Sequence, residues 1–334
     1  MHSLTKRFWY QPRYSFVTVL LLPFSWLFRG IVALRYCLYK NKYLKTIQFS
    51  VPVIIVGNIS VGGTGKTPLV IALAHFLKEQ GLHPGIVSRG VGGKRQRLPL
   101  FITKESEPDQ VGDEALLLHK RSLCPVMIGI DRPQAVKALL DRTQCDIVLC
   151  DDGLQHYRLA RDIEIAVVDE VRQFGNCCLL PAGPLREPIS RLKRVDFVIS
   201  QGEHLSETTM TLQPEAVFSL KNKYDERSLK DFQQKPVHAF AAIGHPDRFY
   251  KLLRYHGLQI IEHAYPDHYL FVEKDFKLND NFLILMTEKD AVKCSRFADE
   301  RFFYLSVSAL LHDQFKEALF NQLQKIKGIT QCVA

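Results

Sequence analysis

Acidic residues are absent from the start of this 334-residue chain, where the first one is Glu79. The whole chain has 44 Lys and Arg residues against 35 Asp and Glu, a formal net charge of +9. Eight of the basic residues lie in residues 1–50, which leaves 36 basic and 35 acidic residues in the remainder. The positive excess therefore belongs to the N-terminal segment. A nucleic-acid-binding protein would spread basic residues over a folded face, so we expect no nucleic-acid partner.

Paired cysteine motifs are also absent. The eight cysteines include no CxxC pair and no Cys/His spacing typical of zinc. We therefore expect neither a zinc site nor a disulfide framework, and reduced thiols fit a cytosolic protein. Hydrophobic residues make up 46% and charged residues 24%, which excludes a disordered chain. A length of 334 residues favours two domains, because single cores stop growing near ~250–300 residues.

The N-terminal segment lacks a long uninterrupted apolar run. Residues 14–28 give 15 positions without a charge, whereas a membrane span needs about 20. Arg29 and Arg35 follow, Pro23 would kink a helix, and no small-residue cleavage site of a signal peptide is present. We therefore predict that residues 1–45 form a basic, apolar helix or kinked pair in the membrane interface. A buried helix of a soluble protein and a single membrane span remain open.

Short β-branched runs alternate with helical patterns along residues 46–235. Residues 51–57 predict a strand buried on both faces, and residues 68–80 predict the helix that follows it. Further strands are predicted at 86–88, 125–130, 146–150, 163–168 and 195–200, with helices at 112–119 and 133–140. This alternation predicts an α/β fold with a mainly parallel sheet and helices on both faces.

The same pattern restarts after a polar stretch at residues 202–235, which we interpret as a connection. A smaller C-terminal α/β domain is predicted from strands at 236–243 and 282–286 and helices at 246–256 and 309–328. The expected organisation is a membrane-interface segment (1–45), a main domain with its linker (46–235) and a smaller α/β domain (236–334).

A glycine-rich segment between the strand at 51–57 and its helix carries the strongest chemical signal. It consists of Ser60, Val61, Gly62, Gly63, Thr64, Gly65, Lys66 and Thr67. Consecutive backbone N–H groups in such a loop converge on phosphate oxygens, and the helix N-terminus adds its dipole. Lys66 would reach the β- and γ-phosphates, and Thr67 would ligate Mg²⁺. Ser60 replaces the usual first glycine, yet the context predicts a P-loop NTPase-type domain.

Two adjacent carboxylates, Asp151 and Asp152, follow the strand at 146–150, where a Walker-B acid is expected. Adjacent carboxylates repel each other unless a cation lies nearby. We therefore predict a metal site here, although a solvated turn is the simpler alternative. Gln155 and His156 follow closely enough to reach the same cleft.

Two further acid-containing segments are candidates for catalysis. Asp113 and Glu114 open an apolar helix, where acids usually complement the helix dipole. His268 follows Asp267 in an aromatic segment, where a histidine is often a packing or surface residue. From the residues alone, both interpretations stay open.

Arginine side chains are also placed by rigid segments. Arg186 and Glu187 lie between two prolines, and Arg132 follows an acid at a predicted helix start. A guanidinium near a transferring phosphate is a common need, whereas a structural ion pair is the alternative. The segment 287–290 (TEKD) resembles a guanine-reading motif with its lysine displaced by one position, so we give it no such role.

Seven motifs together resemble the tetraacyldisaccharide 4'-kinases, the lipid A 4'-kinases of Gram-negative bacteria. They run through most of the chain in the family's order: GNISVGGTGKTP (57–68), SRG (88–90), GDEA (112–115), DDGLQH (151–156), PAGPLREP (181–188), YPDHY (265–269) and TEKDAVK (287–293). The resemblance implies transfer of the ATP γ-phosphoryl to the 4'-hydroxyl of a tetraacylated glucosamine disaccharide 1-phosphate, giving lipid IVA. It also implies a peripheral protein on the cytoplasmic face of the inner membrane, with no obligate protein partner.

The resemblance further implies roles for individual residues. Asp113 is the expected base, paired with His268. Lys66 and Thr67 hold phosphate and Mg²⁺, and Glu114, Asp151 and Asp152 surround the metal, with Gln155 beside the nucleotide. The remaining expected members of the active-site group are Arg132, Arg186 and Glu187.

Two other functions share part of this pattern. A membrane-associated NTPase of the switch or partner-loading class would need the phosphate loop and Asp151 but not the segments 181–188 and 265–269. A soluble small-molecule kinase would not need residues 1–45. The lipid kinase is the only one of the three that uses all of these features.

Overall fold

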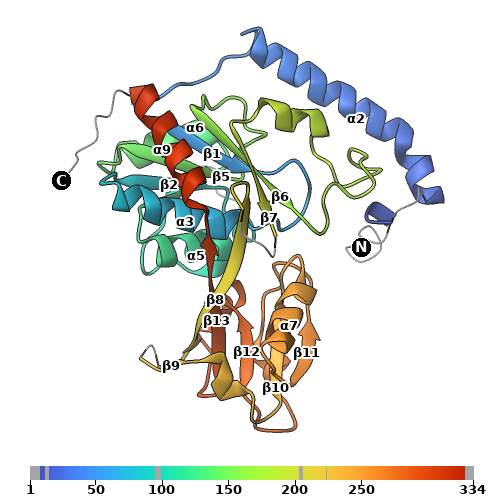
Figure 1. Cartoon of the computed structure of the whole chain (residues 1–334), viewed down its shortest axis with the longest axis vertical. Coiled ribbons are helices and arrows are strands. Elements are labelled where there is room, and N and C mark those ends of the chain that lie inside the picture. Colours follow the sequence, from blue (N-terminus) through green and yellow to red (C-terminus); the bar gives the residue numbers. More distant parts are fainter. Residues whose placement is uncertain (1–7, 12–14, 95–98, 203–205, 223, 328–334) are drawn as a thin grey trace.

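A parallel sheet centred on strand β1 (Val53–Gly57) forms the first lobe of the computed structural model (Figure 1). The structure describes residues 8–11, 15–94, 99–202, 206–222 and 224–327. Strand β1 pairs in parallel with β5 (Ile147–Asp151) on one side and β6 (Ile163–Asp169) on the other. The sheet continues through β2 (Pro84–Ser88), β4 (Val126–Ile128), β7 (Phe197–Gln201) and an antiparallel edge strand, β3 (Leu100–Phe101).

Helices cover both faces of this sheet, as the sequence predicts. Every residue of β1 is buried, and its side chains alternate between two cores. Ile54 packs with helices on one face, whereas Ile55 packs with a helix on the other, because successive side chains of a strand point to opposite faces. The first-lobe helices are α3 (Lys66–Glu79), α4 (Pro108–Val111), α5 (Asp113–Ser122), α6 (Arg132–Leu140) and the 3₁₀ helix η1 (Ile189–Arg194).

The other lobe is built on parallel strands around the buried strand β10 (Val237–Ala241). Its neighbours are β11 (Ile260–Ala264) and β12 (Ile284–Thr287), and β12 pairs with β13 (Phe302–Leu310). The lobe also contains α7 (Pro246–Tyr255), α8 (Glu288–Cys294), and the 3₁₀ helices η2 (Leu229–Phe232) and η3 (Glu273–Phe276).

The segment expected to be a plain connection is instead structured. Residues 202–235 contain the long strand β8 (Thr209–Ser219) and the short β9 (Glu226–Arg227), which pairs with it. Strand β8 begins parallel to β7 and then runs antiparallel to β13, so the two lobes share one continuous sheet. The strands β8 and β13 therefore form the ladder that joins the lobes (Figure 1).

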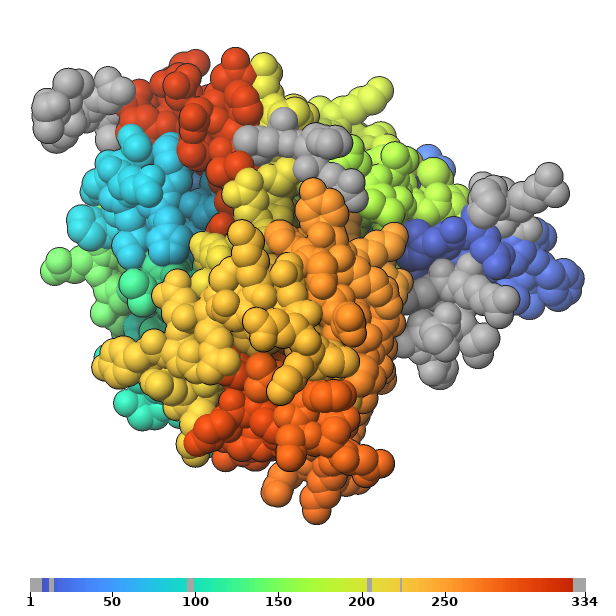
Figure 2. All heavy atoms as spheres, turned by 60° about the horizontal axis from the view of Figure 1, so that its bottom comes forward, coloured from blue at the N-terminus to red at the C-terminus, as the bar shows by residue number. Residues whose placement is uncertain are grey.

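The C-terminal helix α9 (Asp313–Lys327) does not stay with the second lobe, so the expected domain 236–334 needs correction. Phe315, Leu319 and Leu323 are buried in the same core as the α3 residues Leu73 and Leu77. In Figure 2, the red end of the chain lies against the cyan first lobe, away from the orange second lobe. The reason is hydrophobic: the α3–α5 face of the sheet is completed by the apolar face of α9.

Helix α2 (Phe16–Lys40) runs along the outside of the first lobe (Figure 1). It is one continuous helix with Pro23 inside, so the alternative of a kinked pair does not hold. A helix of a soluble protein buries its apolar side chains, but α2 shows the reverse pattern. Thr18 is fully buried, whereas Phe16 is 82% and Trp26 65% exposed. Among the described residues, α2 is the helix long and apolar enough to cross a membrane. The alternative of a buried N-terminal helix is therefore wrong.

Candidate active site

The glycine-rich segment forms a loop between the end of β1 and the start of α3. Gly62 and Gly65 both have positive φ angles, +114° and +81°. A Cβ atom on Gly65 would also lie 2.6 Å from the Met210 side chain, so only glycine fits there. The Asn58 amide donates hydrogen bonds to the Thr64 hydroxyl (3.1 Å) and the Gly62 carbonyl (3.4 Å). The loop is thus held open as a cradle at a helix N-terminus, the geometry that binds phosphate.

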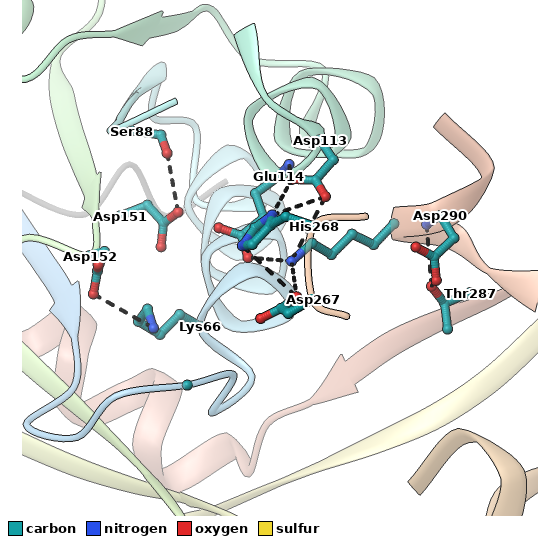
Figure 3. A network of polar contacts seen from close by, with 12 residues as sticks. Lys66, Ser88, Asp113, Glu114, Asp151, Asp152, Asp267, His268, Thr287 and Asp290 are labelled. Carbon is teal, nitrogen blue, oxygen red and sulfur yellow. Dashed lines mark hydrogen bonds and ion pairs between the residues drawn. The ribbon is translucent and has the colours of Figure 1, made fainter. Parts of the chain in front are cut away.

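Two cations contact Asp152 beside this cradle, and Figure 3 shows one of them, Lys66. Lys66 Nζ lies 3.6 Å from its carboxylate, and the Arg186 guanidinium donates to both oxygens at 3.1 and 3.2 Å. Burial raises the pKa of Asp152, but Lys66 and Arg186 outweigh burial and hold the pKa well below its usual range. Asp152 is therefore a charged carboxylate that lies between Lys66 and Arg186.

Asp151 has a different environment although it is the adjacent residue. It is 2% exposed, and the Ser88 hydroxyl donates to its Oδ2 at 3.3 Å. Burial and the negative charge of Glu114 raise the pKa of Asp151 to about 7, while Lys66 opposes this shift. Its Oδ1 has no hydrogen-bond partner among the described residues. A buried carboxylate with a raised pKa and a free oxygen is a site that a cation would stabilise.

The oxygen atoms at this site suit Mg²⁺ better than a metal ion whose ligands all come from protein side chains. Among the described residues, no three His, Cys, Asp or Glu side chains form a ready metal cage. Mg²⁺ prefers oxygen ligands and keeps several waters and substrate phosphates, so one or two protein oxygens are enough. Asp151 and Thr67 suit this role. The other two expected ligands already have cationic partners: Asp152 contacts Lys66 and Arg186, and Glu114 pairs with Lys289.

The two lobes meet at Asp113 and His268 (Figure 3). His268 Nδ1 lies 3.0 and 3.2 Å from the two Asp113 carboxylate oxygens. The hydrogen bond to Asp113 raises the pKa of His268 against the effect of burial. Burial raises the pKa of Asp113, but the His268 hydrogen bond and the nearby lysines outweigh it and lower the pKa. The pair is therefore a carboxylate oriented by a histidine, as a general base requires.

His268 holds its position at a conformational cost. Its φ angle is +61°, a left-handed conformation that is uncommon for residues other than glycine. Its side chain is 25% exposed, whereas that of Asp113 is 3% exposed. The contact therefore joins a buried carboxylate to a partly exposed histidine.

Two lysines of α8 were not assigned from the sequence. Lys289 Nζ lies 2.9 Å from Glu114, 3.3 Å from Asp267 and 4.0 Å from Asp113. Lys293 Nζ lies 3.7 Å from Asp113. Their spacing of four residues places both on one helix face, and they belong to the segment TEKDAVK. That spacing was the available signal, but only the lobe packing shows which carboxylates they meet.

Arg132 and Glu187 lie behind the site rather than in it. Arg132 is fully buried, and its guanidinium donates to the Asp151 carbonyl at 3.3 Å. Glu187 is 2% exposed and accepts hydrogen bonds from Gln155 (2.9 Å) and from the Tyr157 hydroxyl. Both side chains therefore support the segments that carry Asp151 and Gln155.

Comparison with known proteins identifies the family to which this site belongs. The family model described as "Tetraacyldisaccharide-1-P 4'-kinase" matches residues 17–324. The chain belongs to this family. The tetraacyldisaccharide 4'-kinase of Coxiella burnetii (strain RSA 331 / Henzerling II) is 49% identical over 320 residues, covering 96% of this chain and 95% of the relative. That of Nitrosococcus oceani is 45% identical over 324 residues, covering 97% and 95%.

A solved relative shares the fold of this tetraacyldisaccharide-1-P 4'-kinase family member. The crystal structure of the "apo" form of LpxK from Aquifex aeolicus in complex with ATP has a TM-score of 0.77 and 29% sequence identity. It covers 92% of this chain and 99% of the relative. The predicted fold class and the prediction that the chain is a kinase enzyme are confirmed.

Proposed function

We propose that the chain transfers the γ-phosphoryl group of ATP to the 4'-hydroxyl of a tetraacylated glucosamine disaccharide 1-phosphate, giving lipid IVA. The observation that carries this proposal is the Asp113–His268 pair, at 3.0 Å, formed between the lobe with the phosphate loop and the lobe facing it. A sugar hydroxyl is a poor nucleophile, so a carboxylate oriented by histidine is a suitable base. A switch NTPase would activate water and would not need this pair.

Each proposed role follows from a contact described above. Lys66 and the loop 60–67 hold the β- and γ-phosphates, and Arg186 holds Asp152 against Lys66. Asp113 accepts the proton of the attacking hydroxyl late in the transfer, while His268 donates a hydrogen bond to its carboxylate and holds it in place. Arg132 and Glu187 position the strand end and Gln155.

Mg²⁺ is the metal that these residues suit. Asp151 and Thr67 would hold it, with Glu114 able to join after leaving Lys289. When bound, it would neutralise charge on the transferring phosphate. ATP and Mg²⁺ are therefore the proposed cofactors, and neither nucleic acid nor an obligate protein partner is part of the proposal.

The proposed location is the cytoplasmic face of the inner membrane. Helix α2 exposes apolar side chains such as Leu20 (64%) and Trp26 (65%), and exposed apolar patches of this kind mark membrane or partner contacts. Its segment is also basic and has no acid, which suits anionic lipid on the cytoplasmic side. An acylated substrate leaves a bilayer at ~0.8 kcal/mol per CH₂ exposed, so an enzyme that works at the surface avoids this cost.

A labelling experiment tests the function directly. Purified enzyme is incubated with γ-labelled ATP, Mg²⁺ and the detergent-solubilised disaccharide 1-phosphate, and lipids are separated from free phosphate. Label in the lipid product supports the proposal, and a substrate already phosphorylated at the 4' position is the matched control that should stay unlabelled. Label in free phosphate alone would favour an NTPase. Full activity of a variant lacking residues 1–45 on a water-soluble acceptor would favour a soluble small-molecule kinase.

A further inference from the structure

The Asp113–His268 pair depends on two segments that come from different lobes, so something must fix both at once. Asp113 is at the first turn of α5, whereas His268 lies in the loop after β11 and has a left-handed backbone. Asp113 Oδ1 accepts the N–H of Glu114 at 2.8 Å and lies 3.0 Å from His268, and the two lysines of α8 approach its Oδ2 from the second lobe. The second lobe has a buried ion pair next to this contact, formed by Asp290 and Lys293 of α8.

Lys293 reaches the carboxylate side of the pair. Its side chain is 2% exposed, and its Nζ lies 2.6 Å from Asp290 Oδ1 and 3.7 Å from Asp113 Oδ2. It also lies 5.2 Å from the centre of the Phe271 ring. Lys293 thus lies beside both Asp113 and His268. The Lys293 ammonium therefore lies on the Oδ2 side of the carboxylate, whereas Oδ1 is the oxygen closer to His268.

Asp290 reaches the histidine side of the pair through the backbone. It is fully buried, and its Oδ2 accepts hydrogen bonds from the Ala242 N–H (2.9 Å) and the Thr287 hydroxyl (2.6 Å). The carbonyl of Ala242 in turn accepts the N–H of His268 at 3.2 Å. The carboxylate of Asp290 therefore anchors the backbone of Ala242, the residue whose carbonyl accepts the N–H of His268.

We propose that the buried Asp290–Lys293 ion pair positions both members of the base. Lys293 positions the Asp113 carboxylate, and Asp290 positions His268 through the backbone of Ala242. This inference rests on the proposed function, because it needs Asp113 to act in catalysis. Neither residue is proposed to touch substrate. A buried ion pair gives little net stability compared with apolar residues of similar volume, so stability alone is a weak reason to have one here.

A double substitution separates positioning from folding. Removing one member of a buried pair leaves an unpaired charge and destabilises the protein, whereas removing both is often close to neutral. Asp290→Asn/Lys293→Met should therefore recover most of the melting temperature lost in Lys293→Met alone. Its kcat should stay low, roughly 100-fold below wild type, since a small misplacement of a catalytic group costs about that much. The KM for ATP should change by less than about threefold, because the ground-state nucleotide contacts remain.

A background lacking the base shows whether Lys293 acts through Asp113. Lys293→Met should lower kcat roughly 100-fold in the wild-type background and by less than about threefold in an Asp113→Asn background. Asp280→Asn is the matched control, because it removes a carboxylate 2.9 Å from the buried His238 of the same lobe without touching the base. Its kcat should stay close to wild type.

Three outcomes overturn the proposal. The first is a kcat that recovers together with the melting temperature in the double variant, and the second is an equal loss from Lys293→Met in both backgrounds. Either result, with wild type phosphorylating the disaccharide, rejects positioning and leaves the proposed function intact. A wild-type enzyme that transfers no phosphate to the disaccharide would reject both.

Discussion

At the residue scale, Lys66 and Thr67 are the residues to which we assign the contacts with phosphate and Mg²⁺. Replacing either by Ala should lower kcat by ~10²–10³-fold, the range measured when one preorganised electrostatic contact is removed. The melting temperature should change much less than kcat, because Arg186 still pairs with Asp152 when Lys66 is removed. Steady-state kinetics with ATP checks this. Lys78→Ala, at the far end of the same helix, is the control that should keep normal turnover. Near-normal kcat in both site variants would reject the phosphate-loop assignment.

His268 predicts a pH dependence of stability. Its pKa is raised above 6.5 in the folded state, chiefly by the hydrogen bond to Asp113, so its charged form stabilises the fold. That stabilisation is fully present below pH 6.5 and is lost as the pH rises through the folded pKa. The contribution of Asp113 to folding stability has the opposite pH dependence, because the pKa of Asp113 is lowered in the folded state. This contribution is present above pH 3.8 and is lost only as the pH falls below that value. The free energies of unfolding of wild type and His268→Gln, measured by chemical denaturation, should therefore differ most between pH 3.8 and pH 6.5 and converge at alkaline pH. A difference that grows with rising pH would contradict the assignment.

The residues that sequence could predict are those whose chemistry is local. The loop 60–67 lies between a strand and a helix that the same sequence predicts, so phosphate binding by this loop can be predicted without knowing the fold. Asp113 and His268 were candidates with plain alternatives, because their meeting depends on how two lobes pack. Lys289 and Lys293 had no local signal beyond their spacing, and the carboxylates that they meet are distant in sequence.

At the scale of elements, α2 has apolar residues outside and polar residues inside. We expect Leu20→Ser/Trp26→Ser to weaken binding to anionic vesicles, because both side chains are more than half exposed and removing them reduces the apolar area available to lipid. Vesicle co-sedimentation measures this, and binding of the wild type should fall with added salt. Thr18→Ala on the buried face is the matched control. Equal binding by wild type and the double variant would place the membrane surface elsewhere.

The elements missed from sequence are those that join the lobes. Strand β8 contains Pro214, and proline inside a run argues against a strand. In the structure Pro214 pairs with Val307 at an irregularity of the ladder, where a missing N–H is tolerated. The final helix was expected at 309–328, but β13 extends to Leu310 before α9 begins. Both misses arise from long-range pairing, which local patterns do not report.

At the scale of the whole molecule, the two residues of the proposed base come from two lobes. The ladder of β8 and β13 joins the lobes, and α9 returns to pack on the first. A change in lobe orientation would separate Asp113 from His268 while leaving each lobe folded. The fold class was predictable because each βαβ unit is local, whereas the shared sheet and the return of α9 were not. The active site thus depends on the part of the fold that sequence predicts least.

The pairing of Asp113 and His268 across the two lobes can be tested by substitution. Asp113→Ala and His268→Ala should each lower kcat sharply, with smaller changes in the KM for ATP, because both act in the transition state for phosphoryl transfer. If His268 works by orienting Asp113, it has nothing to orient once Asp113 is gone. The double variant should then be little worse than Asp113→Ala alone, as in catalytic residues that act as one unit. Comparing kcat of the two single variants and the double variant tests this. Losses that multiply would mean that the two residues, 3.0 Å apart, act independently.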